Sequence, residues 1–278
     1  MSDDVVALLT ESLSNPKTHM ARGLTNSEHL MLLHARTGCL PFKRLQQYAM
    51  AGAFNGFTMK TKIKPPECAT CLMCYSPHVP RNFTARVRPP RVGVVHSDVF
   101  GPVITPNGKH FFVLFVEEYS MACEVYTRTN KATSTMSACL TSFIADFITA
   151  NNHTFTRLQS DYESTHRAID LQTLVKKMGA HSTFSAECQH HQNVIAESRV
   201  KMIDKQGRSM LARQGDIPVD WFPLAIEHAA FSLTRAQGHS QSSYMTSFEA
   251  LTGRKCDITK LRMWGAHAFI KIETPTQH

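Results

Sequence analysis

The sequence predicts an α/β fold in which a mixed five-stranded sheet is flanked by helices and preceded by a small zinc-binding helical domain. Apolar segments rich in Val, Ile, Phe and Tyr alternate with stretches of helical periodicity over residues 92–213. Their order is three strands, helix, strand, helix, strand, helix, which favours a sheet with both antiparallel and parallel neighbours. Two short helices and a group of cysteines precede these segments.

Composition and charge indicate which partner and which compartment to expect for this protein. The chain has 278 residues, of which 42% are hydrophobic, and a formal net charge of +8. This charge favours a polyanionic partner, nucleic acid first, although a merely basic protein is the alternative. No window approaches the roughly 18 apolar residues of a membrane span, and the acidic N-terminus does not resemble a signal peptide. We therefore expect an intracellular protein with no membrane partner, whose eight cysteines are thiols or metal ligands.

Two short helices are expected near the start of the chain. Thr25 and Glu28 can form a capping box, and Gly38 can end the first helix. Pro41 and Gly52 mark the beginning and end of the second helix. Because two helices this short lack a core of their own, a structural metal ion would help to hold them together.

Three cysteines follow these helices at the spacing of metal ligands. Cys68, Cys71 and Cys74 form two overlapping Cys-x-x-Cys pairs, and two thiolates on a tight turn suit one tetrahedral zinc ion. The other ligands should come from upstream, where His34 and Cys39 are available. We expect a closed structural zinc site, and a small core of reduced thiols is the alternative.

The segments from residue 92 onward predict the sheet and its helices. Three closely spaced apolar segments favour an antiparallel meander, and two further short strands alternate with helices. The expected strands are residues 92–98, 110–120, 122–129, 154–161 and 180–185. The expected helices are residues 130–152, 166–179 and 192–213. More helix is expected over residues 216–250, and a terminal strand over residues 263–273.

These elements divide the chain into five expected parts. Pro and Arg are frequent after the cysteines, and no acidic residue occurs between Glu67 and Asp98, so this stretch is interpreted as a basic linker. The parts are a lead-in, the zinc-binding domain, the linker, the α/β core and a helical extension with a terminal strand, over residues 1–24, 25–76, 77–91, 92–213 and 214–278 respectively.

Three acidic residues are placed where predicted elements end or begin. Asp98 ends the first strand, which Gly101 and Pro102 should stop; Asp161 ends the fourth strand, and Glu197 lies in the first turns of the long helix. Neighbouring strands can bring two such carboxylates together, and a helix crossing that edge can add the third. Carboxylate oxygens suit Mg²⁺ or Mn²⁺, and two such ions can support in-line attack on a phosphodiester. Taken singly, each acid is explained equally well as a turn, cap or surface residue.

The acids also lie within recognisable motifs. Residues 96–102 match His-Ser/Thr-Asp-x-x-Gly-Pro, residues 160–161 match Ser-Asp, and Asn193, Ala196 and Glu197 match Asn-Gly-x-Ala-Glu. Thirty-five residues separate the second acid from the third. In these motifs and this spacing, the chain resembles the integrases of copia-type (Pseudoviridae) LTR retrotransposons, which are DDE recombinases with an RNase H-like fold.

The resemblance covers about residues 33–270 and implies roles for the acids. It implies that Asp98, Asp161 and Glu197 are the catalytic residues and the ligands of Mg²⁺ or Mn²⁺. It also implies that residues 92–213 form an RNase H-like catalytic core.

The resemblance bears on the zinc ligands too. The family has His-x-x-x-x-His upstream of its cysteine pair, which implies the set His34, Cys39, Cys68 and Cys71, with Cys39 in place of a histidine. Zinc accepts either ligand type. Cys74 falls where the family usually has Gly and is not expected to bind, and His29 is a spare candidate.

Several residues depart from the family pattern. Val194 stands where the family has the Gly after Asn193, and Ser198 stands where an Arg follows the Glu. Tyr, Glu, Ser and Thr occupy residues 162–165 in place of Asn-Gly-Gly-Glu, and Glu117 and Glu118 replace two Asp. Such changes fit either a diverged active element or a decayed copy.

Basic and polar side chains near the acids are candidates for DNA contact. Lys201 lies one helical turn after Glu197, Lys205 follows one turn later, and Arg199 is offset from that face. By resemblance, the polar residue one turn before the acid, Asn193, also contacts DNA. The linker offers further cations that can neutralise phosphates, Arg86, Arg88 and Arg91. A solvated basic surface is the alternative for each.

By this resemblance, the sequence predicts DNA integration by 3′-end processing and strand transfer. Its partners would be double-stranded DNA, both element ends and target, with no small-molecule substrate. A homo-oligomer is expected, because joining two ends needs more than one active site, and the nucleus is the expected place of action. The alternatives are a non-catalytic DNA-binding protein, domesticated or decayed, and a different RNase H-like nuclease.

Overall fold

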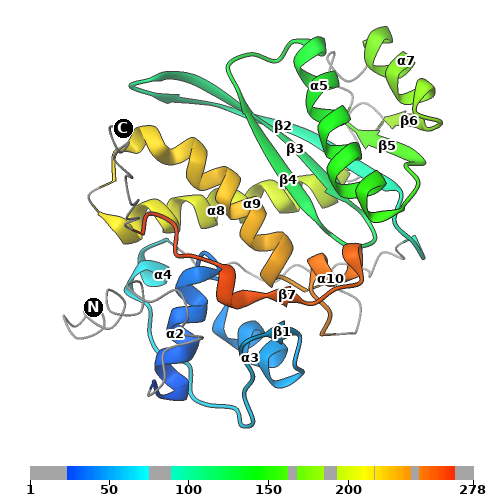
Figure 1. The fold of residues 1–278 in the computed structure, drawn as a ribbon. Helices are drawn as coiled ribbons and strands as arrows, with labels where there is room; N and C mark the ends of the chain where they lie inside the picture. Colours follow the sequence, from blue (N-terminus) through cyan, green and yellow to red (C-terminus); the bar gives the residue numbers. More distant parts are fainter. Residues whose placement is uncertain are drawn as a thin grey trace, which may run out of the picture.

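The computed structural model describes residues 24–74, 89–161, 168–184, 193–215, 217–238 and 244–266, and Figure 1 shows their arrangement. The expected lead-in, except for its last residue, and nearly all of the basic linker fall outside these ranges. Residues 263–266, the described part of the expected terminal strand, form a turn closed by a hydrogen bond from the N–H of Ala266 to the carbonyl of Met263. None of the helices within the described ranges is both long and apolar enough to cross a membrane.

A mixed five-stranded sheet lies in the upper half of the molecule as drawn in Figure 1, with strand order β4-β3-β2-β5-β6. Its strands are β2 (Val94–Thr105), β3 (Gly108–Glu117), β4 (Cys123–Arg128), β5 (Arg157–Ser160) and β6 (His181–Phe184). β2, β3 and β4 form the antiparallel meander, and β5 and β6 run parallel to β2. The predicted fold class, a mixed five-stranded sheet flanked by helices, is confirmed.

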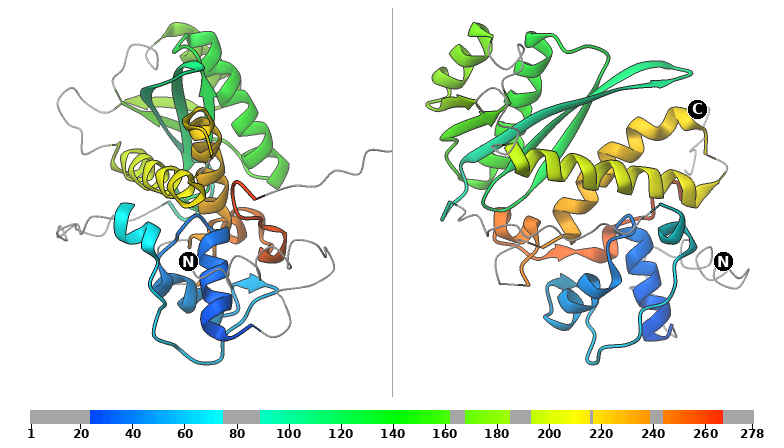
Figure 2. Two further views of the ribbon diagram at one scale, coloured as in Figure 1. Left: turned by 90° about the vertical axis from the view of Figure 1, so that its left-hand side faces the viewer. Right: turned by 180° about the vertical axis from the view of Figure 1, so that it is seen from behind.

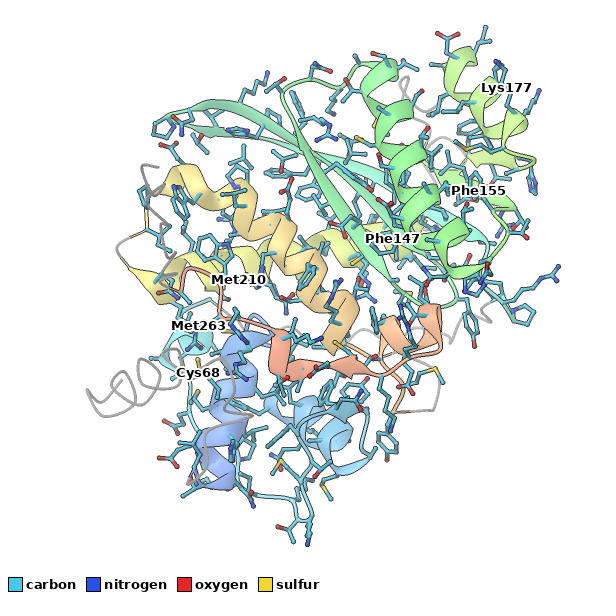
Figure 3. All side chains as sticks on the ribbon, viewed as in Figure 1. Cys68, Phe147, Phe155, Lys177, Met210 and Met263 are labelled. Carbon is cyan, nitrogen blue, oxygen red and sulfur yellow. The ribbon has the colours of Figure 1, made fainter. Side chains whose placement is uncertain are left out.

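Helices cover both faces of the sheet. Consecutive residues of a strand point to opposite sides, so the continuous apolar run of β3 gives both faces buried apolar side chains. Val113 and Phe115 pack with α5 and α7, whereas Phe112 and Leu114 pack with α8 and α9. Met210 and Phe155, labelled in Figure 3, belong to these two cores and lie on opposite sides of the sheet. The helices and helical turns here are α5 (Thr133–Phe143), η1 (Ile144–Ile148), η2 (Thr149–Asn151), α7 (Ile169–Lys177), α8 (Val194–Gln214), η4 (Val219–Trp221) and α9 (Phe222–Ala236).

The N-terminal segment packs on the α8 and α9 side of the molecule (Figure 2). Leu30, Leu33 and Leu45 are fully buried in one core with Ile203 of α8 and Ile226 of α9. The segment also contributes β1, which pairs in parallel with β7 near the end of the described chain. Its elements and their partners are α2 (Asn26–Arg36), α3 (Phe42–Met50), β1 (Phe54–Asn55), α4 (Ala69–Cys74), α10 (Ser247–Thr252), β7 (Cys256–Asp257) and η5 (Ile258–Lys260).

The predicted helix signals at this end are present in the structure. The Thr25 hydroxyl accepts a hydrogen bond from the Glu28 N–H at 3.3 Å, and the Glu28 carboxylate accepts one from the Thr25 N–H at 2.7 Å. This reciprocal pair is the capping box that satisfies two N–H groups at the start of α2. Gly38, with φ of 70°, follows the helix in the left-handed region where glycine is favoured.

The prediction that Asp98 ends a strand is wrong. β2 continues to Thr105, so Asp98 lies within it. Gly101 and Pro102 do not stop the strand, because pairing with β3 resumes after a register shift between Phe100 and Val103. Such a bulge accommodates a proline that cannot donate to the ladder. What ends near Asp98 is the pairing of β2 with β5.

Candidate active site and metal centre

The parallel pairing of β2 with β5 sets the relation between the first two acids. The last paired residues are Ser97 and Ser160; Asp98 comes next within β2, and Asp161 is the first residue after β5, so the register makes them neighbours on strands that lie about 4.8 Å apart. Both belong to the face of the sheet that α8 covers, because Phe100, two residues after Asp98, packs in the core shared with α8. Both side chains are partly exposed. Register therefore brings two of the three predicted acids to one place.

The third acid approaches from α8, whose first turn is tied to β2. Asn193, the residue before the helix, donates from Nδ2 to the carbonyl oxygen of Ser97 at 3.0 Å. Glu197 lies one turn later on the same side of the helix and is partly exposed. The start of the helix that carries Glu197 is thus hydrogen-bonded to β2, the strand that carries Asp98. The three acids share one region but do not form a tight cluster, since the only group of three or more potential ligands within 4.8 Å among the described residues is elsewhere.

A buried polar network lies beneath these acids, and sequence reasoning missed it. His96 is fully buried; its Nε2 lies 3.0 Å from Oε2 of Glu118, and its Nδ1 lies 3.3 Å from Oδ1 of Asn193. Arg157 of β5 approaches the same Glu118 oxygen at 3.7 Å. The network joins β2, β5, the end of β3 and the start of α8. A histidine inside an apolar strand, two residues before Asp98, was the available signal.

The neighbouring acid, Glu117, has a structural role. Its carboxylate accepts hydrogen bonds from the N–H and the hydroxyl of Ser120, both at 2.6 Å, and from the N–H of Gly93 at 3.2 Å. Burial raises the pKa of this carboxyl even though these hydrogen bonds oppose the shift. The acidic pair that the resemblance singled out is therefore buried and bonded within the protein.

The predicted zinc ligands lie together in the structure. The ligand atoms of His34, Cys39, Cys68 and Cys71 all lie within 4.8 Å of one another, and His34 Nε2 is 3.2 Å from Cys71 Sγ. Ligands of a tetrahedral zinc ion, at about 2.0–2.3 Å from the metal, would be separated by about 3.3–3.8 Å. We call these four residues the cysteine cluster. Their soft donor set and their spacing fit zinc.

The contacts of His34 leave its Nε2 atom on the side of the cysteine sulfur atoms. Nδ1 lies 2.7 Å from the carbonyl oxygen of Leu40, so this nitrogen carries the proton and Nε2 keeps its lone pair facing the thiols. The ring stacks on Phe42 with 4.0 Å between centroids. The spare candidate, His29, packs its ring near Phe57 instead and is not part of the cysteine cluster. The side chain of Cys74 lies outside those described.

Electrostatics favour a thiolate in the cysteine cluster. The hydrogen bond from the Cys71 thiol lowers the pKa of Cys39 to about 4. His34 and Arg213 add to this shift, whereas burial opposes it. The same hydrogen bond, together with burial, raises the pKa of Cys71. Arg213, near the end of α8, donates from Nη2 to the sulfur atoms of Cys39 at 3.3 Å and Cys68 at 3.1 Å. Thiolates are the form that binds metal.

Two of the candidates for DNA contact lie inside the protein. Arg199 is 1% exposed and donates to the side-chain oxygen of Gln237 and to the carbonyl of Met121. Asn193 is 3% exposed and has both amide atoms on protein partners. The structure therefore does not support DNA contacts for these two residues, because helix position alone did not reveal the groups that cover them.

The remaining candidates differ in exposure. Lys201 is exposed on α8, one turn after Glu197, and Lys205 is half-buried one turn further on. Arg91 is exposed just before β2. Arg86 and Arg88 lie outside the described residues. Lys201 and Arg91 thus present positive charge to solvent.

Comparison with known proteins finds similarity in structure. No family model matches the sequence. A chain of the simian T-cell lymphotropic virus intasome in complex with PP2A regulatory subunit B56 gamma is 12% identical, with 76% of this chain and 69% of that chain covered and a TM-score of 0.49. The HTLV-2 integrase catalytic core domain, in complex with magnesium and in trimeric form, is 14% identical, with 58% and 97% covered and a TM-score of 0.45. The catalytic core domain of BIV integrase is 19% identical, with 58% and 93% covered and a TM-score of 0.44. Two of these similar structures are thus retroviral integrase catalytic cores.

Proposed function

We propose that this chain is an integrase of a copia-type LTR retrotransposon that processes the 3′ ends of double-stranded DNA and transfers them into target DNA. The observation that carries the proposal is the register of β2 and β5, which makes Asp98 and Asp161 neighbours, on the face reached by the first turn of α8. Residues 92–213 would form the catalytic core.

The donor set at this place fits a hard divalent cation. Three partly exposed carboxylates, all oxygen donors, are carried by β2, by the residue after β5 and by the first turn of α8. Carboxylates drawn together there would repel one another, and Mg²⁺ or Mn²⁺ would offset that repulsion. Bound there, the cations would polarise the phosphodiester and favour deprotonation of the attacking water or 3′-hydroxyl.

The protein's own part is to hold the carboxylates and to attract the DNA backbone. The sheet fixes Asp98 and Asp161, and the hydrogen bond from Asn193 to Ser97 fixes the start of the helix that carries Glu197. Lys201, exposed on the same helix face, and Arg91 would neutralise phosphates beside the acids. No side chain needs to form a covalent bond with DNA in such a reaction.

The cysteine cluster would hold a structural zinc ion. Its members come from α2, the turn after it and the region of α4, so one ion would link segments that are separate in sequence. All four ligand positions would belong to the protein, which leaves no open position for substrate. Its role in this proposal is to stabilise the N-terminal segment.

The first experiment uses a labelled duplex with a recessed 3′ end, incubated with the protein and Mn²⁺ or Mg²⁺. We expect nicked and joined products from the unaltered chain and none from Asp161→Asn, which keeps the size of the side chain but loses its charge. Sedimentation of the DNA complex would show whether the protein acts as an oligomer. Fluorescent tagging in host cells would test for nuclear localisation.

The same assay separates the rival functions. Salt-dependent binding of the duplex without products would favour a non-catalytic DNA-binding protein, which the departures at residues 162–165 and Val194 motivate. Preferential cleavage of an RNA–DNA hybrid would favour a different RNase H-like nuclease.

The replacement of the family's Gly by Val194 does not strain the backbone. Val194 begins α8 and does not have the positive φ that would require glycine.

A further inference from the structure

Arg213 is a cation in direct contact with two sulfur atoms of the cysteine cluster. Its Nη2 donates to Cys39 Sγ at 3.3 Å and to Cys68 Sγ at 3.1 Å. The guanidinium group stays charged in proteins, so these are charge-assisted hydrogen bonds when the sulfur atoms are thiolates. Arg213 lies one residue before the end of α8, the helix whose first turn carries Glu197.

The ligand set explains why a cation would be needed here. A zinc ion with two cysteine thiolates and two neutral histidines has no net charge, whereas three thiolates and one histidine give a net charge of −1. This chain has the second set, because Cys39 stands where the resembling family has histidine. His34 and Cys39 are only 1% and 2% exposed, and an uncompensated charge in such a place is costly.

We propose that Arg213 is the counter-ion of a Cys₃His zinc site, and that Cys39 and Arg213 form a compensating pair. This inference rests on the proposed zinc site and not on integrase activity. The guanidinium group makes the buried site neutral, and its N–H groups lower the electron density on the sulfur atoms that they contact.

The arrangement also attaches the zinc site to the catalytic side of the molecule. Gln206, two turns before Arg213 on α8, donates to the carbonyl of Thr37 at 3.2 Å. Figure 2 shows α8 extending from the sheet to α4, the helix that carries Cys71. One helix therefore contacts the carboxylate region at its start and the zinc ligands at its end.

The test compares two replacements of Arg213 in the full chain. R213M removes the charge and keeps much of the length, whereas R213K keeps the charge and loses the forked geometry. R208M is the matched control on the same helix, since Arg208 is 64% exposed and pairs with Asp204. Zinc content and affinity are measured by competition with a chromogenic chelator. We expect R213M to bind zinc about 10- to 100-fold more weakly, R213K to lose less, and R208M to match the unaltered chain.

A second background separates charge from packing. C39H restores two histidines and a neutral site, and histidine tolerates the positive φ of 65° found at Cys39. In that background, R213M should change zinc affinity by less than about threefold, because no net charge remains to be balanced. The rate of alkylation of the zinc-bound thiolates gives an independent readout, and it should rise in R213M with Cys39 and Cys68 as the modified sites.

Three outcomes would overturn the proposal. R213M could match R208M in both affinity and alkylation, which would mean that the guanidinium group does not act on the site. R213K could be as weak as R213M, which would mean that charge is not the cause. The loss in R213M could persist in a zinc-binding C39H background, which would indicate packing. Each readout uses zinc or thiols alone, so loss of integrase activity would not change any of these results.

Discussion

Asn193 uses both atoms of its side-chain amide inside the protein. Because Nδ2 donates to the Ser97 carbonyl, Oδ1 must face His96, and the His96 nitrogen on that side must be a donor. The sequence placed Asn193 one turn before Glu197 and suggested a DNA contact. It could not reveal partners that lie 96 and 97 residues away in the chain. The predicted DNA contact of Arg199 is unsupported for the same reason, because its partner Gln237 is 38 residues away.

Replacing Asn193 should therefore affect folding more than DNA affinity. N193A would leave the buried Nδ1 of His96 without its acceptor and would release the start of α8. We expect a loss of about 1–3 kcal/mol in the free energy of unfolding, measured by urea denaturation, together with weaker strand transfer. Unchanged stability combined with a large loss of duplex affinity would restore the DNA contact that the sequence suggested.

Lys201 should behave in the opposite way. K201A removes an exposed charge, so the free energy of unfolding should change by less than about 0.5 kcal/mol. Duplex binding should weaken, and the slope of log affinity against log salt should fall by about 1. Fluorescence anisotropy at several salt concentrations measures both. An unchanged slope would show that Lys201 does not face phosphate.

At the scale of elements, local patterns predicted most of the fold. The order of strands and helices follows from apolar periodicity, and the capping box at Thr25 is a local signal that the structure bears out. The length of β2 was not predictable in this way, because pairing with β3 carries the strand past Gly101 and Pro102. The cysteine cluster was predictable because ligand spacing is local, whereas the cation that contacts it comes from the far end of α8.

Glu124 on the edge strand β4 gives a pH dependence. Burial, together with the nearby acids Glu227 and Asp146, raises the pKa of Glu124 to about 7, although Arg235 opposes the shift. A raised pKa means that the protonated form is favoured in the folded state. The stabilisation is complete below the unfolded value of about 4.5 and is lost as the pH rises through 7.

E124Q should remove this dependence, because glutamine stays neutral. Between pH 5 and pH 8, the unaltered chain should lose about 1–3 kcal/mol relative to E124Q. Urea denaturation of both proteins at matched pH values measures the difference. Parallel stability profiles for the two proteins would show that Glu124 is well solvated when charged.

At the scale of the whole molecule, the N-terminal segment and the α/β core share packing. The sequence predicted two domains joined by a linker, because composition changes sharply at the proline-rich stretch. In the structure, Leu30 and Leu33 lie in one apolar cluster with residues of α8 and α9, and β1 pairs with β7. Such contacts between distant segments are invisible to local pattern. If the cysteine cluster holds zinc as proposed, these contacts make that site part of the stability of the whole described structure.

Removal of zinc should therefore lower the stability of the entire molecule in a single transition. An ion present at about 1,000 times its dissociation constant contributes about 4 kcal/mol, and each kcal/mol is worth about 2–4 °C in Tm for a chain of this size. Calorimetry with and without a chelator should show one peak that moves down by about 10 °C. C71A should already melt at the lower temperature and should not respond to the chelator. A new low-temperature peak with the main peak unmoved would show that the N-terminal segment unfolds by itself, and the shared core would then be too weak to couple the two.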